Sequence, residues 1–135
     1  MTDVIYRKYA SINSKGSGGT QTQVFRLPVG TGNTNGDWVR INVPTVSKLL
    51  RLRLPQGTPS TTLSFQVRTP GEAGTEASVA AAGDSSSVLS LTVNGAGVFG
   101  AAVLAPLSSL VDDLELRVVL GTAPASAINI LLEVA

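Results

Sequence analysis

The chain has 135 residues, a formal net charge of +1 and only 14% charged residues, and it contains no Cys and no His. These totals exclude a disulfide framework and a thiolate site, and they remove the commonest acid/base at neutral pH and the commonest zinc ligand. The length suits a single domain that can bury a core, and the small net charge gives no electrostatic footprint for nucleic acid.

The apolar segments are too short to predict a membrane-spanning helix. The longest one, 98–107, is interrupted by Gly100 and Pro106 and falls well short of the ~20 residues that a span needs. Residues 1–10 have no apolar core ahead of their charges, so we expect no secretory signal there. The scarcity of charge indicates either a surface rich in Ser, Thr and Gly or a surface partly buried between subunits, because interface cores are depleted in charge; we favour the second interpretation.

The first 22 residues predict a short strand at 3–10 and then a flexible arm. Residues 11–22 are rich in Gly, Ser and Thr and offer almost nothing to bury. This arm is either an ordinary mobile terminus or a segment that becomes ordered on a neighbouring subunit. We therefore divide the chain into an arm at 1–22 and a β-sandwich domain at 23–135.

From residue 23 onward, short segments with period-2 alternation recur between turns rich in Pro, Gly and Asn. In the clearest one, Leu50, Leu52 and Leu54 alternate with Arg51 and Arg53. The expected strands are 23–27 (ended by Pro28), 38–43, 48–54, 62–68, 88–93, 98–104, 114–120 and 127–134.

Helix signals are few. Residues 76–82 predict either a helical turn, from their Ala content, or an extended surface loop. Pro106 is expected to open a single helical turn. The pattern as a whole predicts an all-β fold, an antiparallel β-sandwich that is jelly-roll-like and has about eight to nine strands.

Residues 88–104 suggest where the protein contacts another copy. Asn94-Gly95 suits a type I′ turn, so we expect a β-hairpin. Its return strand, 98–104, is apolar on both faces and needs a cover on each side, and in so small a chain the second cover is expected to be another copy. The expected oligomer interface comprises Val98, Phe99, Ala101, Ala102, Val103 and Leu104.

No set of residues predicts nucleophilic catalysis. Without His or Cys a serine would need Lys as its base, and Lys8, Lys15 and Lys48 lie in no Ser-x-x-Lys setting. The glycine-rich stretches 16–19 and 30–36 lack the Lys-Ser/Thr pair of a phosphate loop.

The carboxylates likewise predict no site. Asp112 and Asp113 would point to opposite faces of a strand. Glu72, Glu76 and Asp84 fall in one loop region but lack the spacing of a calcium loop. We therefore expect no enzyme activity, no catalytic residues, no metal and no cofactor.

Four side chains are candidates for binding a partner. Arg51 and Arg53 project from one face of a strand, and Arg40 is expected on a neighbouring strand. They form either a solvated sheet face or an anchor on an acidic partner surface, because Arg makes bidentate pairs with carboxylates. Trp38, expected to point outward, either packs at the end of the sandwich or at an interface, or stacks on a sugar. Aromatic residues make up only 4% of the chain, which disfavours a stacking platform for nucleic acid.

Residues 23–135, with a sparsely charged sandwich and a Gly/Ala-rich apolar strand, resemble the small decoration or cement proteins of tailed-bacteriophage capsids and other small jelly-roll virion components. The resemblance implies a homo-oligomer, with a trimer favoured, on the capsid surface of a virion, where it binds the major capsid protein or another virion protein. Several linked weak contacts would then give tight attachment. Alternatives remain: a shell-forming coat protein, a tail or fibre component, or a carbohydrate-binding β-sandwich module.

Overall fold

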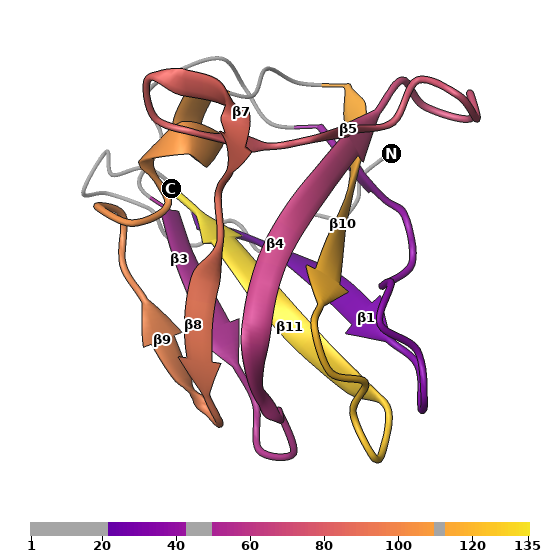
Figure 1. Ribbon diagram of the computed structural model, residues 1–135, viewed down its shortest axis with the longest axis vertical. Helices are drawn as coiled ribbons and strands as arrows, with labels where there is room; N and C mark the ends of the chain where they lie inside the picture. The colour runs from indigo at the N-terminus through magenta and orange to yellow at the C-terminus, as the bar shows by residue number, and fades with distance from the viewer. Residues whose placement is uncertain (1–21, 43–49, 110–112) are drawn as a thin grey trace, which may run out of the picture.

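The structure, a computed structural model, describes residues 22–42, 50–109 and 113–135. They form an antiparallel β-sandwich of two layers (Figure 1). The strands are β1 (Gln23–Val29), β2 (Val39–Ile41), β3 (Leu50–Leu54), β4 (Ser60–Arg68), β5 (Ala77–Ser78), β6 (Ala80–Ala81), β7 (Asp84–Val88), β8 (Leu91–Asn94), β9 (Gly97–Phe99), β10 (Leu114–Leu120) and β11 (Ile128–Val134). A 3-10 helix, η1 (Ala105–Ser109), follows β9.

The two main sheets are built from strands that lie far apart in the sequence. Sheet A has the order β1-β11-β3-β9, and sheet B has the order β2-β10-β4, with β5 and β8 both paired to β4. The pairs are nested: β1 with β11, β2 with β10, β3 with β9 and β4 with β8, all antiparallel. The prediction of an antiparallel β-sandwich is therefore confirmed.

The period-2 pattern of the sequence determines which side chains enter the core. In β3, Leu50, Leu52 and Leu54 are buried between the sheets, whereas Arg51 and Arg53 point outward. Full burial of one Leu or Phe side chain contributes roughly 1.5–3 kcal/mol, so the core is the main source of stability. Among the side chains that are fully buried are Leu27, Val29, Leu52, Leu63, Phe65, Leu116, Val118 and Ile130.

Strand β1 continues through Pro28, so the prediction that this proline ends the strand was wrong. Pro28 lies opposite Asn129 of β11. β1 is an edge strand of sheet A. Proline has no N–H to donate, and an edge strand tolerates it because the free side of the strand pairs with no neighbour. The Pro28 carbonyl accepts a hydrogen bond from the Asp37 N–H (2.9 Å) on the chain leading into β2.

The predicted hairpin at 88–104 does not form. β8 pairs with β4 in sheet B, and β9 pairs with β3 in sheet A, so the chain crosses from one sheet to the other after Asn94. A type I′ turn needs positive φ at both central residues, but of this pair only Gly95 has one, at 88°. The return strand ends at Phe99, which corrects the expected apolar strand 98–104.

Between β4 and β8 the chain makes a small insertion, at the top of Figure 1. It contains β5, which extends the pairing along β4, and a separate two-stranded sheet of β6 and β7. The region is thus extended and not helical. η1 confirms the helical turn expected at Pro106, and among the described residues no helix is long and apolar enough to cross a membrane. The predicted arm, the start of the strand at 48 and Asp112 lie outside the described residues.

Candidate functional site

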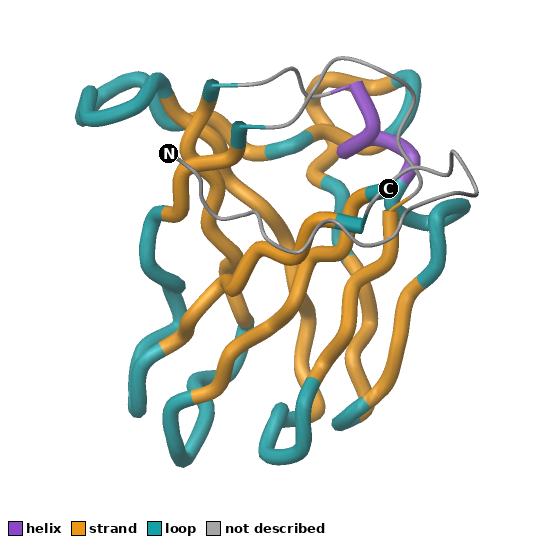
Figure 2. The backbone as a smooth tube through the Cα atoms, turned by 180° about the vertical axis from the view of Figure 1, so that it is seen from behind, coloured by secondary structure: helices purple, strands orange, loops and turns teal. Residues whose placement is uncertain are grey.

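The outer face of sheet A combines arginines with apolar side chains. Cross-strand register places its side chains in two rows that run across the sheet. The first row contains Val24, Glu133 and Arg51, and the second contains Arg26, Leu131, Arg53 and Val98. We call these seven residues face A. The sheet is seen from this side in Figure 2.

The Glu133 carboxylate on face A accepts hydrogen bonds from two guanidinium groups. Arg51 Nε donates to Glu133 Oε1, and Arg53 Nε donates to Oε2 at 3.2 Å. The Glu133 side chain is only 11% exposed, whereas both arginines are about half exposed. The hydrogen bond from Arg51 is the main cause that lowers the pKa of Glu133, and Arg53 adds to it. Three arginines and one carboxylate give face A a net charge of +2, and Arg26 has no ion pair among the described residues.

The predicted interface segment continues from face A at the end of β9. Val98 and Val103 are 56% and 44% exposed, and Ala101 and Ala102 are also exposed. Phe99 packs against the core, and Leu104 is fully buried. Leu104 therefore anchors the segment and offers no surface to a partner, which corrects its assignment to the interface.

A surface hollow of about 350 Å³ joins face A to this segment. Its lining includes Arg51 and Glu133 of face A together with Gly100 and Ala101. Face A and the exposed part of 98–103 are thus one continuous surface. The sequence indicated its arginines and its apolar segment separately, but not their adjacency.

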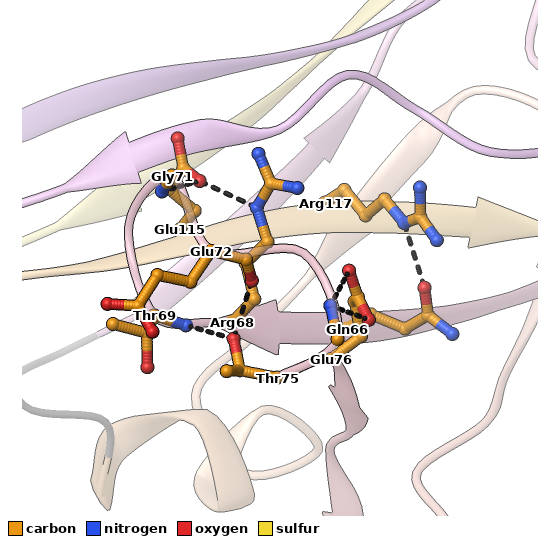
Figure 3. Close-up of polar contacts among 10 residues, drawn as sticks. Gln66, Arg68, Thr69, Gly71, Glu72, Thr75, Glu76, Glu115 and Arg117 are labelled. Atoms are coloured by element: carbon orange, nitrogen blue, oxygen red, sulfur yellow. Dashed lines mark hydrogen bonds and ion pairs between the residues drawn. The ribbon is translucent and has the colours of Figure 1, made fainter.

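The outer face of sheet B is centred on Trp38. The guanidinium carbons of Arg68 and Arg117 lie 4.5 Å and 4.4 Å from the centroid of its ring. Arg68 also pairs with Glu115 (2.7 Å), and Arg117 donates to Gln66 Oε1 (2.8 Å), as Figure 3 shows. The Trp38 ring is half-buried, and guanidinium groups occupy the space where a sugar would stack.

Glu115 connects this cluster to the insertion. Its Oε1 accepts hydrogen bonds from the Gly71 N–H (2.9 Å) and from Arg68 Nε. These two bonds lower the pKa of Glu115, the Gly71 N–H having the larger effect. The loop after β4 is thereby tied to the outer side of sheet B.

Arg40 does not neighbour Arg51 and Arg53, contrary to the prediction. It lies in β2 of sheet B, opposite Glu115 of β10, and its side chain pairs with Asp113 (Nε to Oδ1, 2.8 Å). The four predicted partner-binding residues therefore belong to two separate surfaces, with Arg51 and Arg53 on one and Trp38 and Arg40 on the other.

Two of the three carboxylates of the insertion, those of Glu76 and Asp84, accept local hydrogen bonds. Glu76 accepts the N–H of Gly74 (2.9 and 3.1 Å), and Asp84 accepts hydrogen bonds from the backbone and hydroxyl groups of Ser86 and from the hydroxyl of Ser87. These bonds lower the pKa of both carboxyls. Within 22–42, 50–109 and 113–135, no group of three acidic side chains is placed to hold a metal ion.

A second hollow, of about 400 Å³, lies on sheet B and is lined mainly by Ser and Thr residues. A Cβ at Gly121 would lie 2.7 Å from Thr62 Oγ1, so a larger residue there would require the Thr62 side chain to shift. The sequence alone did not predict this hollow, although outward-facing polar residues alternate along β4 and β8. Its lining includes Ser60, Thr61, Thr62, Thr92, Asn94 and Thr122.

Comparisons with models of protein families, with curated proteins and with solved structures found no match.

Proposed function

We propose that the protein is a structural component of a virion, a decoration or cement protein that associates with itself and binds the capsid surface through the major capsid protein or another virion protein. A trimer is the favoured assembly. The proposal derives from the fold and from one continuous exposed surface.

The nested strand order carries the proposal. Eight strands pair first with last, second with seventh, third with sixth and fourth with fifth, once the insertion of β5 to β7 is set aside. Rolling one long hairpin into two sheets produces this order, and we assign it to a jelly roll. Jelly rolls are the fold of many viral capsid domains and lectins.

The exposed surface supports an assembly role. Face A has a net charge of +2 and carries Val24 and Val98, which are more than half exposed. It continues into Ala101, Ala102 and Val103. Apolar side chains next to arginines are typical of protein–protein interfaces, where Arg is enriched and Lys is depleted.

A carbohydrate-binding module is the second candidate, favoured by the hollow on sheet B whose lining residues are mainly Ser and Thr. Hydroxyl and amide groups are suitable partners for the hydroxyls of a neutral glycan. The coverage of Trp38 by Arg68 and Arg117 argues against a stacked sugar at this ring.

Light scattering coupled to size exclusion tests the proposal. We expect a discrete oligomer of about three copies of the 13.8-kDa chain and no closed particles in negative-stain electron micrographs. Ala101→Asp and Ala102→Asp should each shift the mass toward one copy, because a charge at an interface core is costly to desolvate. A monomer that binds neutral glycans would instead establish the carbohydrate-binding module, and closed particles would identify a shell-forming coat protein.

A further inference from the structure

We propose that face A binds the loop 69–76 of a second copy, so that the copies associate head to tail. This inference rests on the proposed function, because it names the second copy as the acidic partner of the arginines on face A.

The distribution of charge is the first argument. Face A contains Arg26, Arg51 and Arg53 against a single carboxylate, Glu133. The rest of the described chain has the opposite balance, with three arginines and six acidic side chains, a net charge of −3. These residues are Arg40, Arg68, Arg117, Asp37, Glu72, Glu76, Asp84, Asp113 and Glu115. One copy thus offers both a cationic face and an acidic remainder, and complementary potentials of this kind guide association.

The loop 69–76 is the acidic segment that is best placed to reach a neighbour. It projects from the corner of the sandwich in both views (Figures 1 and 2). It carries Glu72 and Glu76, and Glu72 has no hydrogen bond or ion pair from its side chain among the described residues. On face A, Arg26 is likewise unpaired. Each surface therefore has one charge with no partner among the described residues, and the two charges are of opposite sign.

The loop is held in one shape before any partner arrives. The Glu72 N–H donates to the Thr69 carbonyl (3.0 Å), and the Thr75 hydroxyl donates to the Glu72 carbonyl (2.8 Å). The Thr69 N–H donates to Thr75 Oγ1 (3.0 Å), and the Gly71 N–H is bound to Glu115. Figure 3 shows the hydrogen bonds of Thr75 and of Gly71. A pre-formed loop loses little conformational entropy on binding, which favours affinity.

The positions of the two surfaces determine the symmetry of the contact. Face A is the outer side of sheet A, whereas Glu115 fixes the loop to the outer side of sheet B. In a two-fold dimer each copy would have to present both surfaces within one patch, because residue i then contacts residue j and j contacts i. Face A and the loop lie on opposite outer sides of the sandwich, so their contact is head to tail. Such contacts close into a ring when the rotation between copies closes, and otherwise give open filaments.

Charge reversal on the full chain tests the proposal. Arg26→Glu and Glu72→Arg each introduce a like-charge contact without removing an intramolecular one, and both variants should fold like the parent. The protein concentration at which light scattering shows half-dissociation should rise about tenfold or more for either variant, which corresponds to at least about 1.4 kcal/mol. The double variant Arg26→Glu/Glu72→Arg restores opposite charges and should regain the parent's midpoint to within about threefold.

Asp37→Arg is the matched control for Glu72→Arg, because it makes the same charge change at an exposed carboxylate that also has no side-chain partner among the described residues, and it should leave the midpoint unchanged. Raising the salt from about 0.05 M to about 0.5 M should weaken association of the parent. If the parent associates but Arg26→Glu has no effect, or the double variant shows no rescue, the head-to-tail contact is wrong while the proposed function stands. If the parent is a single copy at every concentration, the proposed self-association fails as well.

Discussion

The outer faces of the two sheets use arginine in different ways. On sheet B, Arg68 and Arg117 both lie against Trp38, and each also donates to a neighbouring oxygen, in Glu115 and Gln66 respectively. On face A, Arg51 and Arg53 share one carboxylate, and Arg26 has no partner among the described residues. The first arrangement satisfies its charges within the chain and contributes to stability. The second leaves a surplus of cations at the surface, and the proposed association depends on this surplus.

Replacing Trp38 should have the largest effect on stability. Trp38→Ala removes a half-buried ring and the contacts of two guanidinium groups, and we expect a loss of about 2–3 kcal/mol in the free energy of unfolding. Urea unfolding followed by circular dichroism measures this, because the variant has no tryptophan fluorescence. Trp38→Phe is the matched control and should recover at least half of the loss. A cost for Trp38→Ala below about 0.5 kcal/mol would mean that the ring does not organise sheet B.

Removing the carboxylate of face A should have the next largest effect. Glu133→Ala leaves Arg51 and Arg53 facing each other without a counter-charge, and we expect a loss of about 1–2 kcal/mol. The loss should increase at low salt, where repulsion between guanidinium groups is least screened. Glu133→Leu, which keeps apolar volume without the charge, separates repulsion from lost packing. Equal stability of Glu133→Ala and the parent at low salt would contradict the role assigned to this carboxylate.

Acid should lower the stability of the fold, because each outer face contains a carboxylate with a lowered pKa. The pKa of Glu133 and that of Glu115 are lowered from the usual value of 4.5 by hydrogen bonds that exist only in the folded state. A carboxyl with a lowered folded-state pKa stabilises the protein above its unfolded-state pKa, and this contribution is lost as the pH falls toward the folded value. The free energy of unfolding should therefore decline as the pH drops below about 4.5.

Glu133→Gln isolates the contribution of face A to this decline. The amide cannot titrate, so the variant should lose less stability than the parent between neutral pH and acid. Urea midpoints measured at a series of pH values give the comparison. If the urea midpoint falls equally steeply with pH in the variant and in the parent, Glu133 does not contribute to the acid sensitivity.

The strands were predictable because burial on one face imposes a local pattern. Leu50, Leu52 and Leu54 alternate with two arginines, and that alternation alone identified β3 and its inner face. The hairpin at Asn94-Gly95 was predicted wrongly because a short turn signal does not determine which strand is the partner. β8 and β9 are two residues apart, yet each pairs with a distant strand in a different sheet.

The candidate surfaces were only partly predictable for the same reason. Arg51 and Arg53 share a strand, so their common face could be derived from the sequence. Glu133 joins them only through the pairing of β11 with β3, and Arg40 was misplaced because nothing local assigns β2 to sheet B. Arg26 was overlooked, although it alternates with buried neighbours in β1 in the way that Arg51 and Arg53 do in β3.

The smallest effect on stability is expected at Arg40. Its ion pair with Asp113 belongs neither to the cluster around Trp38 nor to face A. The side chains of Arg40 and Asp113 are 60% and 56% exposed, so water screens their attraction and holding them together costs side-chain entropy. Arg40→Ala should change the free energy of unfolding by no more than about 0.5 kcal/mol. The same substitution should leave the fluorescence of Trp38 unchanged, whereas Arg117→Ala should shift its emission. A large loss of stability in Arg40→Ala would mean that sheet B depends on this exposed pair, and the contrast between a satisfied and an unsatisfied face would then need revision.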